Sequence, residues 1–400
     1  MYSFEKLYVN VAKPVIMLVP KPTPVTYVGA GKVMKTGEIL QMNNVTRVLI
    51  ITDASLHKIG LVDPVIKSLK EAGISYVIYD GVKPDPSYSI VEEALDCCKV
   101  NACNGIVALG GGSVMDTAKV VNVAFTNHKA PQKLKGLLKV RKRGMPFIAI
   151  PTTAGTGSET TVAAVISDPV THDKTQVLDP KIVPCAAILD PELTVGLPVS
   201  ITAHTAMDAL THALEAYTNT YANSETDRFA EIAVKLIYEN VVNVYNNPKD
   251  IKGREALLVA SFYAGMAFTR TYVGYVHAFA HNIGGHFNVP HGLACAAVLP
   301  HVMEFFEPAC EERFAKLCDL VGLSNIDDSV KTKCDKFIKS IYDLNDTLGI
   351  PKRLETFPKS AVIDMCKAGF KECHGTYPVP RYLAPREAQQ MLNKICAKPR

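Results

Sequence analysis

The sequence predicts an α/β domain with an open parallel sheet, followed by an all-helical domain. In the first half of the 400-residue chain, short β-branched and aromatic runs alternate with helical stretches, which is typical of parallel strands joined by crossover helices. After about residue 191, apolar residues instead recur with the roughly 3.6-residue period of amphipathic helices. We therefore expect two domains, covering residues 1–190 and 191–400.

Individual elements follow from these patterns. Two strands that flank a helix form a right-handed crossover and therefore lie parallel, and ligands of such sheets bind at the carboxyl ends of the strands. The predicted strands are 47–52, 75–79, 105–109 and 146–150. Of the predicted helices between them, the first ends near residue 72 and the other two cover 89–99 and 113–124. The predicted helices of the second domain include 201–219, 227–245, 254–268, 311–321 and 329–348.

The composition argues against several classes of protein. The chain has 43 Lys and Arg against 39 Asp and Glu, a formal net charge of +4, which is too neutral for a nucleic-acid or anionic-membrane surface. Its 11 cysteines lack paired CxxC spacing, which indicates reduced thiols in a cytoplasmic protein. We expect no signal peptide, because the N-terminal apolar stretch 14–20 is short and bracketed by prolines. We also expect no membrane span, since the strongest candidate, 292–306, contains His301 and Glu304.

A glycine-rich turn joins a predicted strand to the helix that follows it. It comprises Gly110, Gly111 and Gly112 before Ser113, and consecutive glycines let the backbone approach a phosphate closely. The free N–H groups of the first helical turn add donors at the positive end of the helix dipole. Because the pattern is neither GxGxxG nor a P-loop, a purely structural turn is an equal alternative.

A second polar turn, Pro151 to Glu159, follows the next predicted strand. Amides and hydroxyls from both turns can enclose one dinucleotide, because the carboxyl ends of parallel strands share one edge of the sheet. Asp53 follows the strand at 47–52, where a carboxylate accepts hydrogen bonds from a ribose and repels a 2′-phosphate. This favours NAD over NADP. Alternatively, Asp53 caps the next helix, and one residue can serve both roles.

Seven of the 11 histidines lie between residues 204 and 301. Asp208 and His212 are four residues apart on a predicted helix and project from one face, which suits joint binding of a cation. Taken alone, such a pair is more often an ordinary helical contact.

A second histidine segment, residues 276–292, adds further candidate ligands. His277 and His281 share a helix face, a helix break is expected at Gly284-Gly285, and Pro290 can start a new helix with His291 in its first turn. A chain that turns back here brings His291 beside His277 and completes a site of three histidines and one aspartate. This nitrogen and oxygen set suits Fe(II) or Zn(II).

Four motifs together closely resemble those of the iron-dependent (group III) alcohol dehydrogenases, a family that includes lactaldehyde reductase and 1,3-propanediol dehydrogenase. They are GGGSVMDTAK, PTTAGTGSETT, MDALTHALEAY and VHAFAHNIGGHFNVPHG, in the order of the family. The resemblance extends from about Thr26 to the terminal helix. It implies a dehydroquinate synthase-like fold with an N-terminal dinucleotide-binding domain, a helical domain, a catalytic divalent metal in the cleft between them, and a homodimer.

The resemblance also assigns roles to individual residues. His281 corresponds to a histidine proposed to relay protons or contact substrate, whereas His204 and His286 depart from the family pattern and are more often solvated than part of a substrate pocket. The implied metal ligands are Asp208, His212, His277 and His291. The predicted cofactor contacts are Asp53, Asp85, Gly111, Gly112, Ser113, Thr152, Thr153, Thr156 and Lys174, with Asp85 standing where relatives often have Asn.

These assignments imply reversible hydride transfer between NAD and a small primary alcohol or diol. The metal would act as a Lewis acid, and His281 would pass the proton to water or to the cofactor ribose, unless it only supports a ligand. The alternative is an NAD- and metal-dependent carbon–oxygen lyase of the dehydroquinate-synthase type. Such a lyase needs a basic cluster for a sugar phosphate, and only Arg270 lies near the histidine segment.

Overall fold

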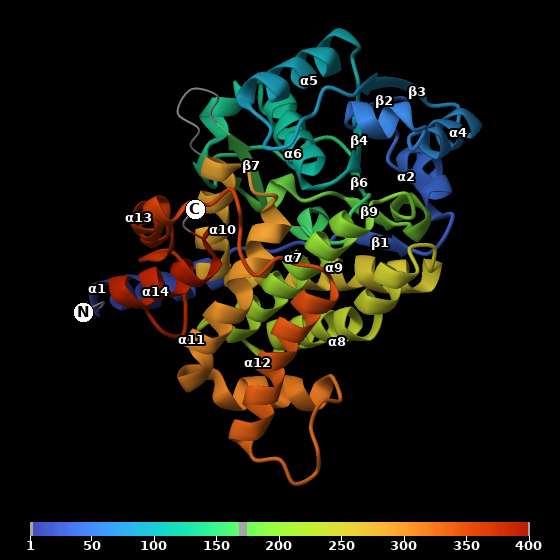
Figure 1. The fold of residues 1–400 in the computed structure, drawn as a ribbon. Coiled ribbons are helices and arrows are strands. Elements are labelled where there is room, and N and C mark those ends of the chain that lie inside the picture. Colours follow the sequence, from blue (N-terminus) through green and yellow to red (C-terminus); the bar gives the residue numbers. More distant parts are fainter. Residues whose placement is uncertain (1–2, 168–173, 399–400) are drawn as a thin grey trace. The chain divides into compact units, whose positions relative to one another are not determined.

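The computed structural model describes residues 3–167 and 174–398, whose elements are labelled in Figure 1. The chain divides by its internal contacts into two compact units. We call Pro20–Gly196 the α/β unit, and Met1–Val19 together with Leu197–Arg400 the helical unit. The sequence-based division at 190 instead placed the N-terminal segment in the first domain. The first helix joins the helical unit through hydrogen bonds from Lys13 Nζ to the Thr220 carbonyl and from Tyr221 Oη to the Val9 carbonyl.

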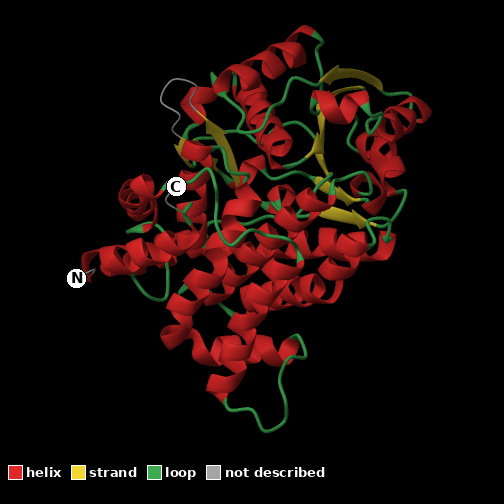
Figure 2. Cartoon of the chain, in the orientation of Figure 1, coloured by secondary structure: helices red, strands yellow, loops and turns green. Residues whose placement is uncertain are grey.

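The α/β unit is built on a parallel sheet with the strand order β1-β9-β6-β4-β2-β3. The strands are β1 (Val25–Val28), β2 (Arg47–Ile51), β3 (Ser75–Tyr79), β4 (Gly105–Gly110), β6 (Phe147–Pro151) and β9 (Ala186–Leu189), drawn as yellow arrows in Figure 2. The predicted open parallel sheet is confirmed, and β2, β3, β4 and β6 are the four predicted strands. The sequence patterns did not predict β1 and β9, because each strand has only four residues and is too short to show a recognisable strand periodicity.

Helices cover both faces of this sheet. The helices of the unit are α2 (Thr36–Met42), α3 (Ala54–Lys58), α4 (Asp63–Glu71), α5 (Tyr88–Val100) and α6 (Gly112–Asn127). Leu49 and Ile106 share a buried core with α5 and α6, whereas the alternate residues Val48 and Val107 share one with α2 and α4. Because successive side chains of a strand point to opposite faces, two-sided burial explains why these strands are continuously apolar.

The strand order reverses between β2 and β4. From β2 the chain passes outward to β3 and then returns across β2, so that β4 pairs with its other edge. In open α/β sheets such a switch point is where ligands bind. Asp53 follows β2 and the glycine-rich turn follows β4, so the sheet topology places both of these predicted cofactor contacts at the switch point.

A second sheet in this unit has the order β5-β8-β7. Its strands are β5 (Gly136–Leu137), β7 (Ala163–Ser167) and β8 (Lys174–Leu178), of which β7 and β8 are antiparallel. Lys174, a predicted cofactor contact, is the first residue of β8, but its side chain lies outside the described residues.

The helical unit consists of helices joined by loops, as the sequence predicted (Figure 2). Its helices are α1 (Ser3–Leu18), α7 (Val199–Thr218), α8 (Ser224–Asn246), α9 (Ile251–Thr271), α10 (Tyr275–Phe287), α11 (His291–Leu320), α12 (Val330–Thr347), α13 (Val362–Cys373) and α14 (Pro385–Ile395). By length and hydropathy alone α11 would also fit a membrane span, but 61% of its most apolar window is buried within the protein. Core packing therefore accounts for its composition.

The predicted helix break at Gly284-Gly285 is wrong. Neither glycine has a positive φ, and α10 continues through both to Phe287. The helix ends instead at Asn288, which has a φ of 53°. Pro290 is the N-cap of α11 and His291 its first residue, so the prediction that His291 lies in the first turn of a new helix is confirmed.

Candidate metal centre and cofactor-binding turns

Three helices of the helical unit bring Asp208, His277 and His291 together. They lie on α7, α10 and α11, and Oδ1 of Asp208 is 3.6 Å from Nε2 of His277 and 3.4 Å from Nε2 of His291. Together with Sγ of Cys295, their ligand atoms all lie within 4.8 Å of one another. The atoms therefore surround a common point.

Two atoms of this group are buried without a hydrogen-bond partner among the described residues. They are Oδ1 of Asp208 and Nε2 of His277, and each residue is only 2% exposed. An unsatisfied buried polar atom costs about 1–3 kcal/mol, so a ligand that accepts both lone pairs is expected. A carboxylate oxygen and imidazole nitrogens are suitable donors for Fe(II) or Zn(II). The residues therefore fit the metal that the sequence motifs imply.

The electrostatics of the group also favour a cation. Burial by itself would lower the pKa of His277, but the neighbouring carboxylates of Asp208 and Glu215 raise it to about 9. Burial would likewise raise the pKa of Asp208, but the charges of His212 and His291 and the proximity of His277 hold it well below its usual value. The carboxylates thus attract positive charge to the point that the histidines face.

Glu215 orients His277, and the sequence analysis missed this role. Its Oε2 accepts a 2.6 Å hydrogen bond from Nδ1 of His277 and a second one from the Gly274 amide, while Oε1 accepts one from the Val276 amide. In the neutral imidazole that binds a metal, donation from Nδ1 leaves the lone pair of His277 on Nε2, the atom that faces Asp208. The available signal was spacing, since Glu215 is two helical turns after Asp208 and so shares its face of α7.

His212, the fourth predicted ligand, lies beside the compact group. Its Nδ1 is 3.9 Å from Oδ1 of Asp208, and its ring stacks on Phe268 and His277 with centroid distances of 4.1 and 4.3 Å. The set of atoms within 4.8 Å of one another contains Cys295 instead of His212. Metal ligation by His212 stays a prediction.

His281 lies next to the candidate metal ligands but bonds to Glu372. Its ring stacks on His291 with a centroid distance of 5.2 Å, and its Nδ1 is 2.7 Å from Oε1 of Glu372. Tyr377 and Asn282 also donate to Glu372. Burial would raise the pKa of Glu372, but His281 and Tyr377 lower it below its usual value, so Glu372 is an anion that can only accept. Nδ1 of His281 is therefore the donor.

Two further histidines, His204 and His286, lie outside the compact group of candidate ligands. These are the two that depart from the family pattern. His286 is exposed, and its Nδ1 bonds to the Asn282 carbonyl within α10. His204 lies one turn before Asp208 on α7, and its carbonyl oxygen would be 2.2 Å from a Cβ at Gly292. Glycine at 292 thus permits the close approach of α11 to α7 that places His291.

In the α/β unit, the two polar turns adjoin each other. Gly110 of β4 pairs with Pro151 of β6, and the Thr152 amide donates to the Gly110 carbonyl. A Cβ at Gly112 would lie 2.9 Å from Cγ2 of Thr156. The predicted contacts Gly111, Gly112, Ser113, Thr152, Thr153 and Thr156 therefore belong to one cluster at the carboxyl ends of two neighbouring strands.

A buried lysine links α6, which begins at the glycine-rich turn, to the second polar turn and the residues after it, and no sequence pattern had singled it out. Lys119 is fully buried in α6, and its Nζ donates to Oγ of Ser158, Oγ1 of Thr161 and the Ala163 carbonyl at 2.7 to 2.9 Å. Ser158 in turn donates to Asp116, three residues before the lysine. Asp116 and Lys119 both belong to the motif GGGSVMDTAK. This motif was the sequence signal that could have identified them.

The two predicted carboxylate contacts lie in loops that follow strands. Asp53 is the N-cap of α3, and its Oδ1 accepts from the Ser55 and Leu56 amides at 2.9 and 3.0 Å. The capping alternative is therefore correct, and a ribose contact stays a prediction. Asp85 has a φ of 51°, in the left-handed region that Asp and Asn tolerate better than most residues.

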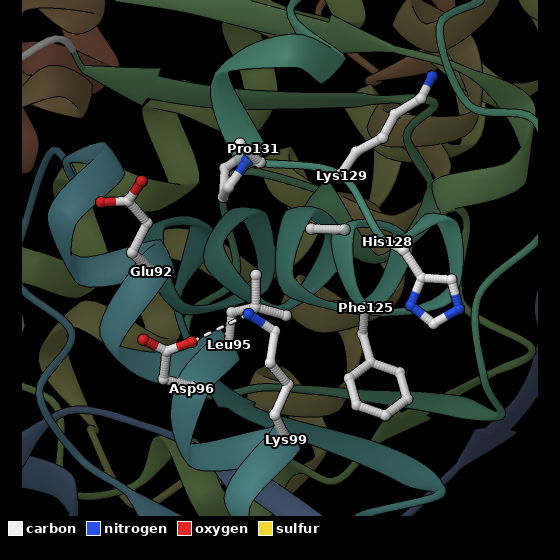
Figure 3. Close-up of a pocket in the computed structure, with 10 residues that line it drawn as sticks. Glu92, Leu95, Asp96, Lys99, Phe125, His128, Lys129 and Pro131 are labelled. Atoms are coloured by element: carbon white, nitrogen blue, oxygen red, sulfur yellow. Dashed lines mark hydrogen bonds and ion pairs between the residues drawn. The ribbon is translucent and has the colours of Figure 1, made fainter.

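Figure 3 shows a cavity in another part of the α/β unit. It has a volume of about 690 Å³ and is lined by residues of α5 and by the C-terminal end of α6, including Phe125 and His128. At about 1.5 Å per residue, the length of α6 separates it by roughly 20 Å from the glycine-rich turn. Two of its charged residues, Asp96 and Lys99, pair with each other. None of the predicted site residues lines it.

Comparisons with known proteins identify the family of this chain. Residues 22–191 match the family model "Iron-containing alcohol dehydrogenase", and residues 202–394 match "Fe-containing alcohol dehydrogenase family, C-terminal". The NAD-dependent methanol dehydrogenase of Bacillus methanolicus is 38% identical over 86% of this chain and 93% of its own length. The 1,3-propanediol dehydrogenase of Klebsiella pneumoniae is 37% identical over 82% of this chain and 86% of its own length.

A solved structure of a 1,3-propanediol oxidoreductase has the same fold. It superposes with a TM-score of 0.91 at 34% identity and covers 94% of this chain and 99% of its own. These relatives are dehydrogenases, and the carbon–oxygen lyase alternative is not favoured. The chain is therefore an oxidoreductase that belongs to the iron-containing alcohol dehydrogenase family.

Proposed function

We propose that this enzyme reversibly oxidises a small primary alcohol or diol to the aldehyde, with NAD as the hydride acceptor. The observation that carries the proposal is the pair of buried, unpartnered atoms, Oδ1 of Asp208 and Nε2 of His277, which point to a divalent cation. The substrate class follows from relatives that are named for methanol and 1,3-propanediol.

The helical unit would hold the metal through Asp208, His212, His277 and His291, with Fe(II) as the expected ion and Zn(II) as the other ion that fits. When bound, this ion supplies Lewis-acid polarisation of the alcohol or carbonyl oxygen. Glu215 keeps His277 in the tautomer that has its lone pair on Nε2.

The α/β unit would bind NAD at the switch point of its sheet. The amides at the start of α6 and the hydroxyls of the second polar turn suit the pyrophosphate, and Asp53 suits an unphosphorylated ribose, which favours NAD over NADP. The proposed contacts are Asp53, Asp85, Gly111, Gly112, Ser113, Thr152, Thr153, Thr156 and Lys174.

His281 is our candidate for the proton transfer that accompanies hydride transfer. Its Nδ1 donates to Glu372, so Nε2 has the lone pair that can take a proton from the substrate hydroxyl. His281→Ala should lower turnover and change its pH profile, with His286→Ala as a control on the exposed side of the same helix. Unchanged turnover at every pH would remove this role.

We also propose that the enzyme is a cytoplasmic homodimer. The cytoplasm is supported by the 11 cysteines, none of which forms a disulfide within the described part of the chain. The dimer is supported by the family resemblance, and sedimentation at several protein concentrations tests it.

The main test measures metal and activity together. Protein purified anaerobically should contain a divalent metal and should reduce small aldehydes with NADH, as followed by the loss of NADH absorbance. His277→Ala should lose the metal, whereas His286→Ala should keep it. Full metal content in His277→Ala would overturn the assignment of the centre.

A further inference from the structure

We infer that Cys295 is a ligand of the metal, so that the donor set of this centre includes a thiolate. Neither the sequence motifs nor the family resemblance assigns this residue a role. The inference rests on the proposed metal centre and adds sulfur to its nitrogen and oxygen donors. Cys295 follows His291 by four residues on α11, which places both side chains on one face of the helix.

The position of the sulfur carries the argument. Sγ of Cys295 is 3.7 Å from Nε2 of His291 and within 4.8 Å of the ligand atoms of Asp208 and His277. Adjacent donors at about 2.0–2.3 Å from one metal ion are roughly 3–4 Å from one another. Three separations among these residues, 3.4, 3.6 and 3.7 Å, lie in this range, and the other pairs are within 4.8 Å, so the four atoms can converge on one small ion.

Burial supports the same conclusion. Cys295 is fully buried, and the neighbouring Asp208 has an orphaned carboxylate oxygen while His277 has an orphaned ring nitrogen. A thiolate beside the Asp208 carboxylate would be repelled unless a cation lay between them. When the metal binds, the sulfur–metal bond forms and the thiol proton passes to solvent, with no change in oxidation state.

The consequence is a preference among metals. A thiolate is a softer donor than an imidazole or a carboxylate, and its presence favours Zn(II) or Co(II) over harder ions. Cys295→Ser should therefore reduce the affinity for Zn(II) about tenfold or more, and should reduce the affinity for Mn(II) much less.

The decisive experiment is the absorption spectrum of the full-length protein reconstituted with Co(II). Wild type should show a thiolate-to-cobalt charge-transfer band in the near ultraviolet. Cys295→Ser should lose this band at unchanged cobalt stoichiometry. Cys310→Ser, which changes another buried cysteine of α11, should keep it.

The results distinguish a failure of the role inferred for Cys295 from a failure of the proposed metal centre. A cobalt-loaded wild type without the band, or a band that survives in Cys295→Ser, overturns the role of Cys295. Cobalt retained by His277→Ala overturns the metal centre itself. Absence of the band from cobalt-loaded wild type overturns the role of Cys295 without any variant, so the inference stays falsifiable even where Cys295→Ser does not fold.

Discussion

The carboxylate of Glu215 and the imidazole of His277 form a 2.6 Å hydrogen bond between two helices of the helical unit. Glu215 is 2% exposed, and its two oxygens accept three N–H groups in all. Only a carboxylate provides acceptors on both of its terminal atoms, so this contact selects glutamate and, through it, the tautomer of His277.

Replacing this carboxylate should weaken the metal centre. Glu215→Gln turns an NH₂ group toward one of the three donors and removes the negative charge, so metal affinity should fall about 10–100-fold. Competition with a chelator measures this effect. Glu225→Gln on the exposed surface of α8 is the control, and equal chelator resistance in both variants would contradict the prediction.

Glycine at 292 should be required for the position of His291. In Gly292→Ala, the new methyl group would be 2.2 Å from the His204 carbonyl oxygen, so α11 must move away from α7. Overpacking of this kind costs about 1–3 kcal/mol, and both the melting temperature and the metal content should fall.

Gly285→Ala is the matched control for this substitution, because a Cβ at Gly285 in α10 meets nothing within 4 Å. Its metal content and melting temperature should equal or exceed those of the wild type, since alanine favours a helix. Equal metal content in the two variants would show that the contact with α7 does not position His291.

Loss of the Lys119 contacts should weaken cofactor binding without affecting the metal. Lys119→Met removes the donor shared by Ser158, Thr161 and Ala163. It also leaves the Asp116 carboxylate, 3.8 Å from Nζ, without its counter-charge, which costs several kcal/mol and releases the second polar turn. The Kd for NADH, measured by fluorescence, should rise, while the metal content should stay constant. Lys99→Met on the surface of α5 is the control, and an unchanged Kd in Lys119→Met would exclude this role.

Stability should depend on pH through Glu159. Burial raises the pKa of Glu159 from 4.5 to about 7, with a smaller opposing effect from Lys119. Between these values the folded state binds more protons than the unfolded state. The stabilising contribution is therefore complete below about pH 4.5 and is lost as the pH rises through about 7.

Melting temperatures measured across this pH range check the prediction. The wild type should lose stability as the pH approaches 7, and Glu159→Gln should show a flatter profile because its side chain is neutral throughout. Parallel profiles in both proteins would show that Glu159 does not titrate in this window.

Much of the fold was predictable because it depends on local patterns. Continuous apolar runs identified β2 and β4 and thus the turns at their ends, and helical periodicity located α7 and α12. The break expected at Gly284 was wrong because glycine weakens a helix without ending it, and the surrounding contacts decided where α10 stops.

By itself, the sequence determined which residues are candidates for the chemistry, since Asp208 and His212, or His277 and His281, share a helix face through spacing alone. Only the tertiary structure decided which of them meet. The approach of α7, α10 and α11 depends on packing between residues far apart in the chain, and it brings Glu215 to His277 and Cys295 to Asp208. No local pattern records such a contact, because helical spacing relates residues within one helix and not between helices.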